Sequence, residues 1–191
     1  MIRALIFDCF GVLYRPSAQT LMDLVPMSEQ ERVRDITRAC DHGIISRGDY
    51  FEQIAELLGK SPDDIRAIDR NEHVRNDQLI EYIKLLKKEY KIGLLSNIGD
   101  ETMDELFPEN ERHDLFDAFV LSSNIGLIKP AIEVFEYTAA QLGMPADECV
   151  MIDDLLKNVD GAERAGMKGI VFTSNRQLEL DLGSLLGTKH A

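Results

Sequence analysis

The sequence predicts an α/β fold, a doubly wound parallel sheet with a small helical domain inserted into it. Short apolar runs typical of strands buried on both faces recur along the chain, beginning with Ala4-Leu5-Ile6-Phe7. From Leu79 onward such runs alternate with segments of helical periodicity, which indicates right-handed βαβ units. Between the first two runs the periodicity is helical throughout. We therefore expect residues 1–14 and 78–191 to form the sheet domain and residues 15–77 to form the insert.

The sheet domain is expected to alternate strands with amphipathic helices. After the first strand, apolar runs predict further strands at 92–95, 118–121, 149–152 and 169–172. Helical stripes predict helices over 79–90, near 131–142 and near 159–165. A terminal amphipathic helix is predicted by Leu178, Leu182, Leu185 and Leu186, and its acids Glu179 and Asp181 are expected to face water.

The insert carries sequence signals for helix starts and stops. Ser28 with Glu31, and Ser61 with Asp64, have the spacing of capping boxes. Pro62 suits a first helical position, and Gly59 is expected to end a helix. Two helical stripes follow from Val33, Ile36, Thr37 and Cys40, and from Tyr50, Ile54, Leu57 and Leu58.

Composition limits the partners that this chain can bind. Its 191 residues are 45% hydrophobic and 29% charged, which is ordinary for a soluble globular protein. The formal net charge of −13 opposes binding to nucleic acid and to anionic membrane, both of which normally need a basic surface. No apolar run reaches the roughly 18 residues needed to span a bilayer, and the start Met1-Ile2-Arg3 lacks the features of a secretory signal. We expect a cytoplasmic protein whose three cysteines, Cys9, Cys40 and Cys149, are reduced.

Asp8 is the first candidate functional residue, because it directly follows a buried strand and precedes Gly11, where the backbone can turn sharply. Ligands of open α/β sheets bind at the carboxyl ends of the strands. A lone aspartate at such a place is also typical of a turn or helix cap. Three distant segments favour a site instead. They are Ser96-Asn97 after a strand, Lys129 before Pro130, and Asp153-Asp154 after another strand.

Together these side chains predict a phosphoryl-transfer site. An aspartate can take a phosphoryl group if nearby charge is neutralised, usually by a divalent metal. Asp8 with Asp153 and Asp154 supplies the hard oxygen ligands that Mg²⁺ prefers. The hydroxyl of Ser96, the amide of Asn97 and the ammonium of Lys129 can bind phosphate oxygens. A small anion can thus bind an acidic chain.

The order Asp8, Ser96-Asn97, Lys129-Pro130, Asp153-Asp154 resembles the haloacid dehalogenase-like hydrolase superfamily. The stretch MIDDLLKNVDGAERAGM is similar to the metal-binding motif of that family, and the insert segment GIISRGDYFEQIAELLG also resembles family sequences. The resemblance covers nearly the whole chain. It implies a Rossmann-like core with a small helical cap domain.

Carried over by this resemblance, Asp8 is the nucleophile and a metal ligand. Ser96 and Lys129 bind the phosphoryl group, Asn97 supports that pocket, and Asp153 and Asp154 complete a Mg²⁺ site. The substrate implied is a small phosphorylated metabolite such as a sugar phosphate. Cap side chains set specificity in this family, so the sequence does not name the substrate, and the oligomeric state is equally open.

Phe10 departs from the family pattern, since family phosphatases usually carry there a second aspartate that acts as general acid and base. Its backbone carbonyl can still serve as the metal ligand that the family takes from this position. Two alternatives to a phosphatase remain. One is a haloacid dehalogenase, whose relatives have an aromatic residue at this position but lack the acidic pair. The other is a binding protein that has lost turnover.

Overall fold

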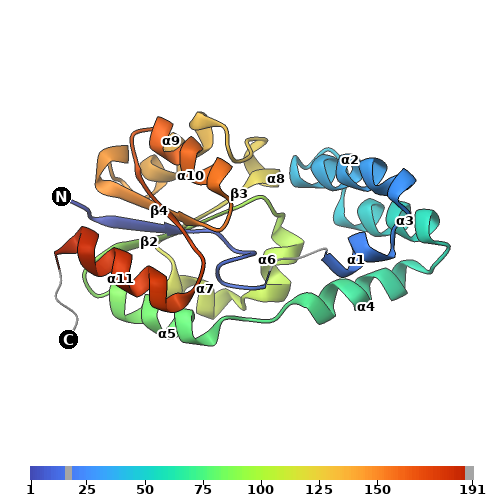
Figure 1. Cartoon of the computed structure of the whole chain (residues 1–191), viewed down its shortest axis with the longest axis horizontal. Helices are drawn as coiled ribbons and strands as arrows, with labels where there is room; N and C mark the ends of the chain where they lie inside the picture. Colours follow the sequence, from blue (N-terminus) through green and yellow to red (C-terminus); the bar gives the residue numbers. More distant parts are fainter. Residues whose placement is uncertain (16–18, 188–191) are drawn as a thin grey trace.

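The computed structural model describes residues 1–15 and 19–187, and it has a parallel five-stranded sheet at its centre. The strands lie in the order β3-β2-β1-β4-β5, and each pairs with its neighbours in parallel. Figure 1 shows helices on both faces of this sheet, as the predicted doubly wound fold requires. The strand bounds are β1 Ala4–Phe7, β2 Lys91–Ser96, β3 Ala118–Leu121, β4 Cys149–Asp153 and β5 Lys168–Val171.

The first strand is apolar at every position because it lies in the middle of the sheet and is buried on both faces. Leu5 and Phe7 pack into one hydrophobic cluster, together with α5, α6, α7 and α11. Ala4 and Ile6 point the other way, into a second cluster with α9 and α10. Alternating residues of one strand thus hold two layers of helices on one sheet.

The helices of the sheet domain follow the strands in the expected order. They are α5 Asp77–Leu86, α6 Asp100–Leu106, α7 Glu109–Leu115, α8 Ser122–Ile125, α9 Ile132–Gln141, α10 Leu156–Arg164 and α11 Asn175–Leu186, with a 3-10 turn η2 at Ala146–Glu148. In α11, Leu178 and Leu182 are buried as predicted. The prediction was wrong for Leu185, which is 38% exposed.

The segment between β1 and α5 is helical, and its helices gather at one end of the molecule in Figure 1. They are α1 Gln19–Leu24, η1 Met27–Glu29, α2 Gln30–Asp41, α3 Arg47–Leu58 and α4 Pro62–Glu72. The four α-helices among them share a separate hydrophobic cluster that includes Ile36, Phe51 and Ile54. The two chain segments that lead into and out of these helices lie side by side, and the backbone amide of Arg15 donates to the carbonyl of Val74 at 2.9 Å.

The division into residues 1–14 with 78–191 and an insert at 15–77 stays a prediction. Residues 16–18 of the predicted insert and 188–191 of the predicted sheet domain lie outside the described residues. Within the described parts of the chain, none of the helices has the length and hydropathy needed to cross a bilayer.

Three helix-end predictions can be compared with the structure. Ser61 and Asp64 form a reciprocal capping box at α4, and Gly59 ends α3 in the left-handed conformation, as predicted. The capping box at Ser28 was wrong, because Ser28 lies inside η1 and α2 begins without a side-chain cap. A further capping box, between Ser46 and Asp49, starts α3 and was not predicted.

Candidate active site

The carboxyl ends of three neighbouring strands bring the predicted site residues together. Asp8 follows β1, Ser96 ends β2 and Asp153 ends β4, and β1 lies between the other two strands. Parallel strands end at the same edge of a sheet, so side chains far apart in sequence meet there. All three side chains are buried, with Asp153 fully inaccessible to solvent.

Lys129 forms ion pairs with both carboxylates, those of Asp8 and Asp153. Its ammonium nitrogen lies 2.7 Å from Oδ1 of Asp8 and 2.7 Å from Oδ2 of Asp153. The lysine is 3% exposed, so its charge is not solvated by bulk water and must be balanced by these two acids. Lys129 is therefore held at the carboxyl edge of the sheet, not at the surface.

Asp153 is oriented from three directions. Besides Lys129, the backbone amide of Leu155 donates to Oδ1 at 2.9 Å, and the amide nitrogen of Asn158 lies 2.9 and 3.0 Å from the two oxygens. Leu155 and Asn158 belong to the start of α10, which follows β4 directly. A carboxylate with this many donors is fixed in position before any ligand binds.

Asp8, Asp153 and Asp154 lie close enough to share one metal ion. Ligand oxygens from the three acids all fall within 4.8 Å of one another. Gly11 contributes by lacking a side chain, because a Cβ at that position would lie 2.2 Å from Cγ of Asp154. This set of hard oxygen donors suits Mg²⁺, which accepts a few carboxylates and keeps several waters. The residues present therefore fit a magnesium site.

Burial and ion pairing set the charges of this cluster. Burial is the largest effect on Asp8 and raises its pKa to about 7, although Lys129 acts in the opposite direction. Burial lowers the pKa of Lys129, but the two adjacent carboxylates outweigh it and keep that pKa above its ordinary value. Burial also raises the pKa of Asp154, and the neighbouring charge of Asp153 adds to this effect. The lysine is thus a cation, and the acids around it repel one another when ionised.

Asn97 holds Lys129 through its backbone. The Lys129 amide donates to Oδ1 of Asn97 at 3.0 Å, and the Asn97 side chain donates to the Lys129 carbonyl at 3.4 Å. The side chain of Ser96 lines a cavity next to Asn97 and Lys129. The predicted residues at the end of β2 thus lie at the site, but Asn97 contacts the segment that carries the lysine.

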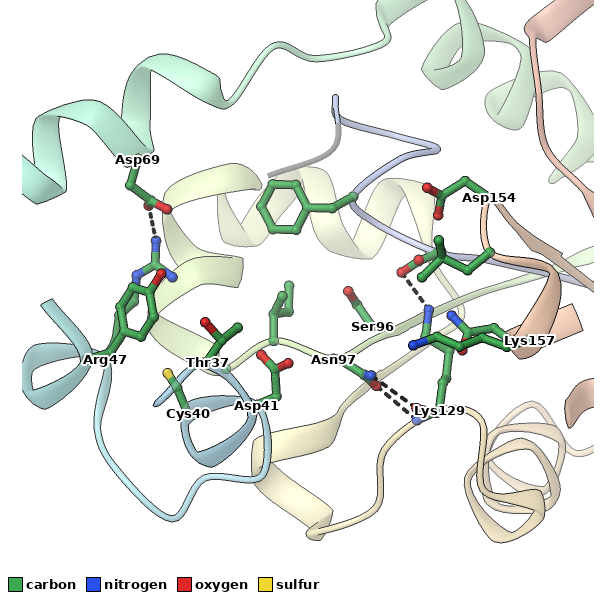
Figure 2. Close-up of a pocket in the computed structure, with 17 residues that line it drawn as sticks. Thr37, Cys40, Asp41, Arg47, Asp69, Ser96, Asn97, Lys129, Asp154 and Lys157 are labelled. Atoms are coloured by element: carbon green, nitrogen blue, oxygen red, sulfur yellow. Dashed lines mark hydrogen bonds and ion pairs between the residues drawn. The ribbon is translucent and has the colours of Figure 1, made fainter. Parts of the chain in front are cut away.

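A cavity of about 380 Å³ opens over this cluster (Figure 2). Its floor contains Asp8, Ser96, Lys129 and Asp154, and its other wall comes from the helices of the predicted insert. The insert residues that line it are Thr37, Cys40, Asp41, Arg47, Tyr50 and Asp69. None of these six was predicted from the sequence as a site residue. One signal was present, since Thr37, Cys40 and Asp41 have the spacing of a single helix face.

Phe10 also lines the cavity, beside Asp8. Its ring lies 5.5 Å from that of His73 and 6.3 Å from that of Tyr14, measured between ring centres. An aromatic side chain at this position supplies no proton to a bound substrate. Any acid–base group must come from another part of the cavity wall.

Comparisons with known proteins agree with this geometry. Residues 2–166 match the model of the haloacid dehalogenase-like hydrolases. The sesquiterpene phosphatase astK of Aspergillus oryzae is 28% identical, over 97% of this chain and 97% of its own length. The N-acylneuraminate-9-phosphatase of Rattus norvegicus is 32% identical over 86% of this chain, which spans 60% of that phosphatase.

A solved structure shows the same fold. The HAD family enzyme of Bacteroides thetaiotaomicron, crystallised with magnesium and inorganic phosphate, superimposes with a TM-score of 0.77. It is 22% identical, and the match covers 92% of this chain and 96% of that protein. The family match spans strands β1 to β4, the helices between β1 and α5, and the four segments that meet at the site. The chain belongs to the haloacid dehalogenase-like hydrolases.

Proposed function

We propose that this protein is a magnesium-dependent phosphatase that acts on a small phosphorylated metabolite. One observation carries the proposal: three carboxylates, from Asp8, Asp153 and Asp154, share a site at the floor of a cavity, beside the buried cation of Lys129. This combination suits a substrate that brings its own negative charge. Asp8 is the nucleophile and takes the phosphoryl group as an aspartyl phosphate.

The metal site of this proposal consists of Asp8, Asp153 and Asp154, together with the backbone carbonyl of Phe10. When bound, Mg²⁺ would supply the positive charge that lets a dianionic ester approach these carboxylates. Asp153 is the best-oriented member, because α10 and Lys129 fix both of its oxygens. The neighbouring structure with magnesium and phosphate supports this assignment as a fold-level analogy.

In the proposed complex, Lys129 and Ser96 bind the oxygens of the phosphoryl group. Lys129 balances charge that develops during transfer, and Ser96 donates from the end of β2. Asn97 keeps the lysine in place through its two hydrogen bonds to that residue's backbone. The helical segment 15–77 acts as the cap, since its residues complete the cavity wall above the phosphoryl site.

The substrate class rests on the cavity and on the relatives. The lining mixes apolar side chains, such as Ile98 and Leu155, with polar ones, such as Thr37 and Tyr50. The names of the similar proteins include phosphatases of a sesquiterpene and of a 9-phosphorylated acylneuraminate. We infer a phosphate monoester of a small alcohol, with sugar phosphates and terpenyl phosphates as the first esters to test. A dehalogenase is disfavoured, because dehalogenation through an alkyl ester needs no Mg²⁺ and so has no use for the acidic pair Asp153 and Asp154.

A panel assay tests the proposal. Purified protein with Mg²⁺ is offered sugar phosphates, nucleotides and terpenyl phosphates, and released phosphate is measured. We expect hydrolysis of at least one class by the wild type and none by Asp8→Asn, because the amide cannot attack phosphorus. The matched control is Asp160→Asn on the exposed face of α10, which should keep full activity. No hydrolysis of any ester, despite bound Mg²⁺, would favour the binding-protein alternative.

A further inference from the structure

Asp41 lies on the cap side of the cavity. It is the last residue of α2, and it faces the cavity from the same helix face as Thr37 and Cys40. Figure 2 shows its carboxylate pointing into the cavity, with Ser96 between it and the Lys129–Asp154 side. The hydroxyl of Ser122, next to β3, donates to the Asp41 carbonyl and ties this helix end to the sheet domain.

The Asp41 carboxylate is available to a substrate. Among residues 1–15 and 19–187, no side chain or amide forms a hydrogen bond or ion pair with it, although the residue is half-buried. Asp69, the other acid on the cap wall, differs in this respect because it is bound by Arg47. A half-buried acid without a protein partner, in a cavity that receives a phosphate ester, can exchange a proton with that ester.

The direction of phosphoryl transfer places the departing oxygen near this wall. Attack and departure at phosphorus are roughly in line, with the nucleophile and the leaving oxygen on opposite sides. Because Asp8 attacks from the edge of the sheet, the leaving oxygen must face the helices of the cap. Asp41 is a cap residue that borders this part of the cavity, whereas Phe10 offers no proton.

We propose that Asp41 is the general acid and base of the reaction, in place of the carboxylate that is missing at Phe10. The inference rests on the proposed phosphatase function. In the first step, the Asp8 oxygen forms a bond to phosphorus, the bond from phosphorus to the ester oxygen breaks, and the Asp41 carboxyl gives its proton to that oxygen. In the second step, ionised Asp41 takes a proton from water, the water oxygen bonds to phosphorus, and the bond to Asp8 breaks.

The acid strength of the cap residues agrees with this assignment. Burial raises the pKa of Asp41 to about 7, and the charges that oppose this shift are those of Lys129 and Lys157 across the cavity. A general acid and base works best when its pKa is near the operating pH. Burial raises the pKa of Cys40 to about 11 and that of Tyr50 to about 12, so neither neighbour suits both steps.

Burst kinetics with p-nitrophenyl phosphate test the second step. This ester's leaving group departs as a stable anion, so only hydrolysis of the aspartyl phosphate needs a proton relay. We expect Asp41→Asn to lower the steady-state rate by about 10²-fold and to release a burst of nitrophenol close to one equivalent per enzyme. Asp35→Asn, on the exposed side of the same helix, should retain the wild-type rate.

A comparison of leaving groups tests the first step. Asp41→Asn should slow hydrolysis of glycerol phosphate in single turnovers by about 10²-fold, while nitrophenol release in the burst stays near wild type. Phe10→Asp in the Asp41→Asn background should restore part of the lost rate. Equal losses of the single-turnover rate for both esters, or nitrophenol release without a burst, would overturn the role of Asp41. A wild type that hydrolyses neither of these esters nor any of the panel would instead reject the phosphatase function itself.

Discussion

Lys129 and Asp8 form a buried ion pair, with the ammonium nitrogen 2.7 Å from a carboxylate oxygen. The same ammonium lies 2.7 Å from Asp153, so one cation serves two acids at the centre of the site. The single positive charge of Lys129 offsets only part of the negative charge of the two carboxylates. A metal cation bound by Asp8, Asp153 and Asp154 would offset the remaining negative charge. The site would then attract a phosphate ester.

Removal of that ammonium should destabilise the metal-free protein. Lys129→Met leaves the carboxylates of Asp8 and Asp153 buried without a counter-ion, and breaking a buried pair costs about 3–5 kcal/mol. Urea unfolding in the presence of a chelator measures the loss. Lys157→Met is the matched control, because this exposed lysine lines the same cavity, and we expect a change within about 0.5 kcal/mol. Equal stability of the two variants would contradict the role of Lys129.

Gly11→Ala should impair the metal site more than the fold. A Cβ at Gly11, whose φ is +91°, would lie 2.2 Å from Cγ of Asp154 and would displace that carboxylate. We expect Mg²⁺ affinity to fall by about 10–100-fold, as when a supporting contact of a metal ligand is lost. Gly59→Ala provides the control, since Gly59 has a φ of +60° and open space around it. Titration of both variants with Mg²⁺ separates the two effects, and similar affinities would exclude crowding of Asp154.

Activity should disappear with chelation. Without a divalent cation, the carboxylates of Asp8, Asp153 and Asp154 repel a phosphate monoester, and a single lysine does not balance them. We expect less than about a hundredth of the rate in excess chelator, restored by added Mg²⁺ or Mn²⁺. Assays before and after dialysis against a chelator check this. Full activity without metal would favour dehalogenase-type chemistry.

Asp41→Asn should stabilise the protein at alkaline pH. The folded pKa of Asp41 is raised from 3.8 to about 7, so the stability that its protonated form contributes is present at low pH and is lost as the pH rises through 7. Asparagine avoids that loss. We expect a gain of up to about 4 kcal/mol at pH 8, from about 1.4 kcal/mol per pKa unit, and a smaller one as the pH falls toward 3.8.

Thermal or urea unfolding of wild type and Asp41→Asn across this pH range provides the measurement. Asp35→Asn, an exposed change on the same helix, should follow the wild type at every pH. A variant that is less stable than the wild type at pH 8 would show that ionised Asp41 has a stabilising partner. A stabilising change that lowers the rate is also expected of a residue kept for its chemistry.

The sheet could be predicted from the sequence because strand burial has a simple signature. Ala4–Phe7 is apolar throughout, as a central strand between two helical layers must be. The capping box at Ser61 was predictable, because the serine directly precedes a helix that begins with Pro62. At Ser28 the same spacing failed, because a 3-10 turn begins earlier and includes the serine. The spacing of Ser28 and Glu31 alone does not indicate whether an α-helix or a 3-10 turn forms at the serine.

The floor of the site was predictable, and its cap wall was not. Asp8 and Asp153 each follow an apolar run, so the topology alone brings them together. Asp41 follows no strand, and its place over the site depends on contacts across the fold, including the bond from Ser122. Arg47 and Asp69 likewise meet through helix packing in the insert. Contacts between residues far apart in the chain leave no local pattern from which a single sequence could predict them.

Asp8 is expected to carry the phosphoryl group during turnover. Rapid quenching of the wild type with Mg²⁺ and a radiolabelled phosphate ester, followed by peptide mapping, would reveal this covalent intermediate. We expect an acid-stable, hydroxylamine-labile phosphoryl group on the peptide that contains Asp8, and no label on Asp8→Asn. Turnover of the ester with no covalent label on the wild type, or with a label on another residue, would show that Asp8 is not the nucleophile.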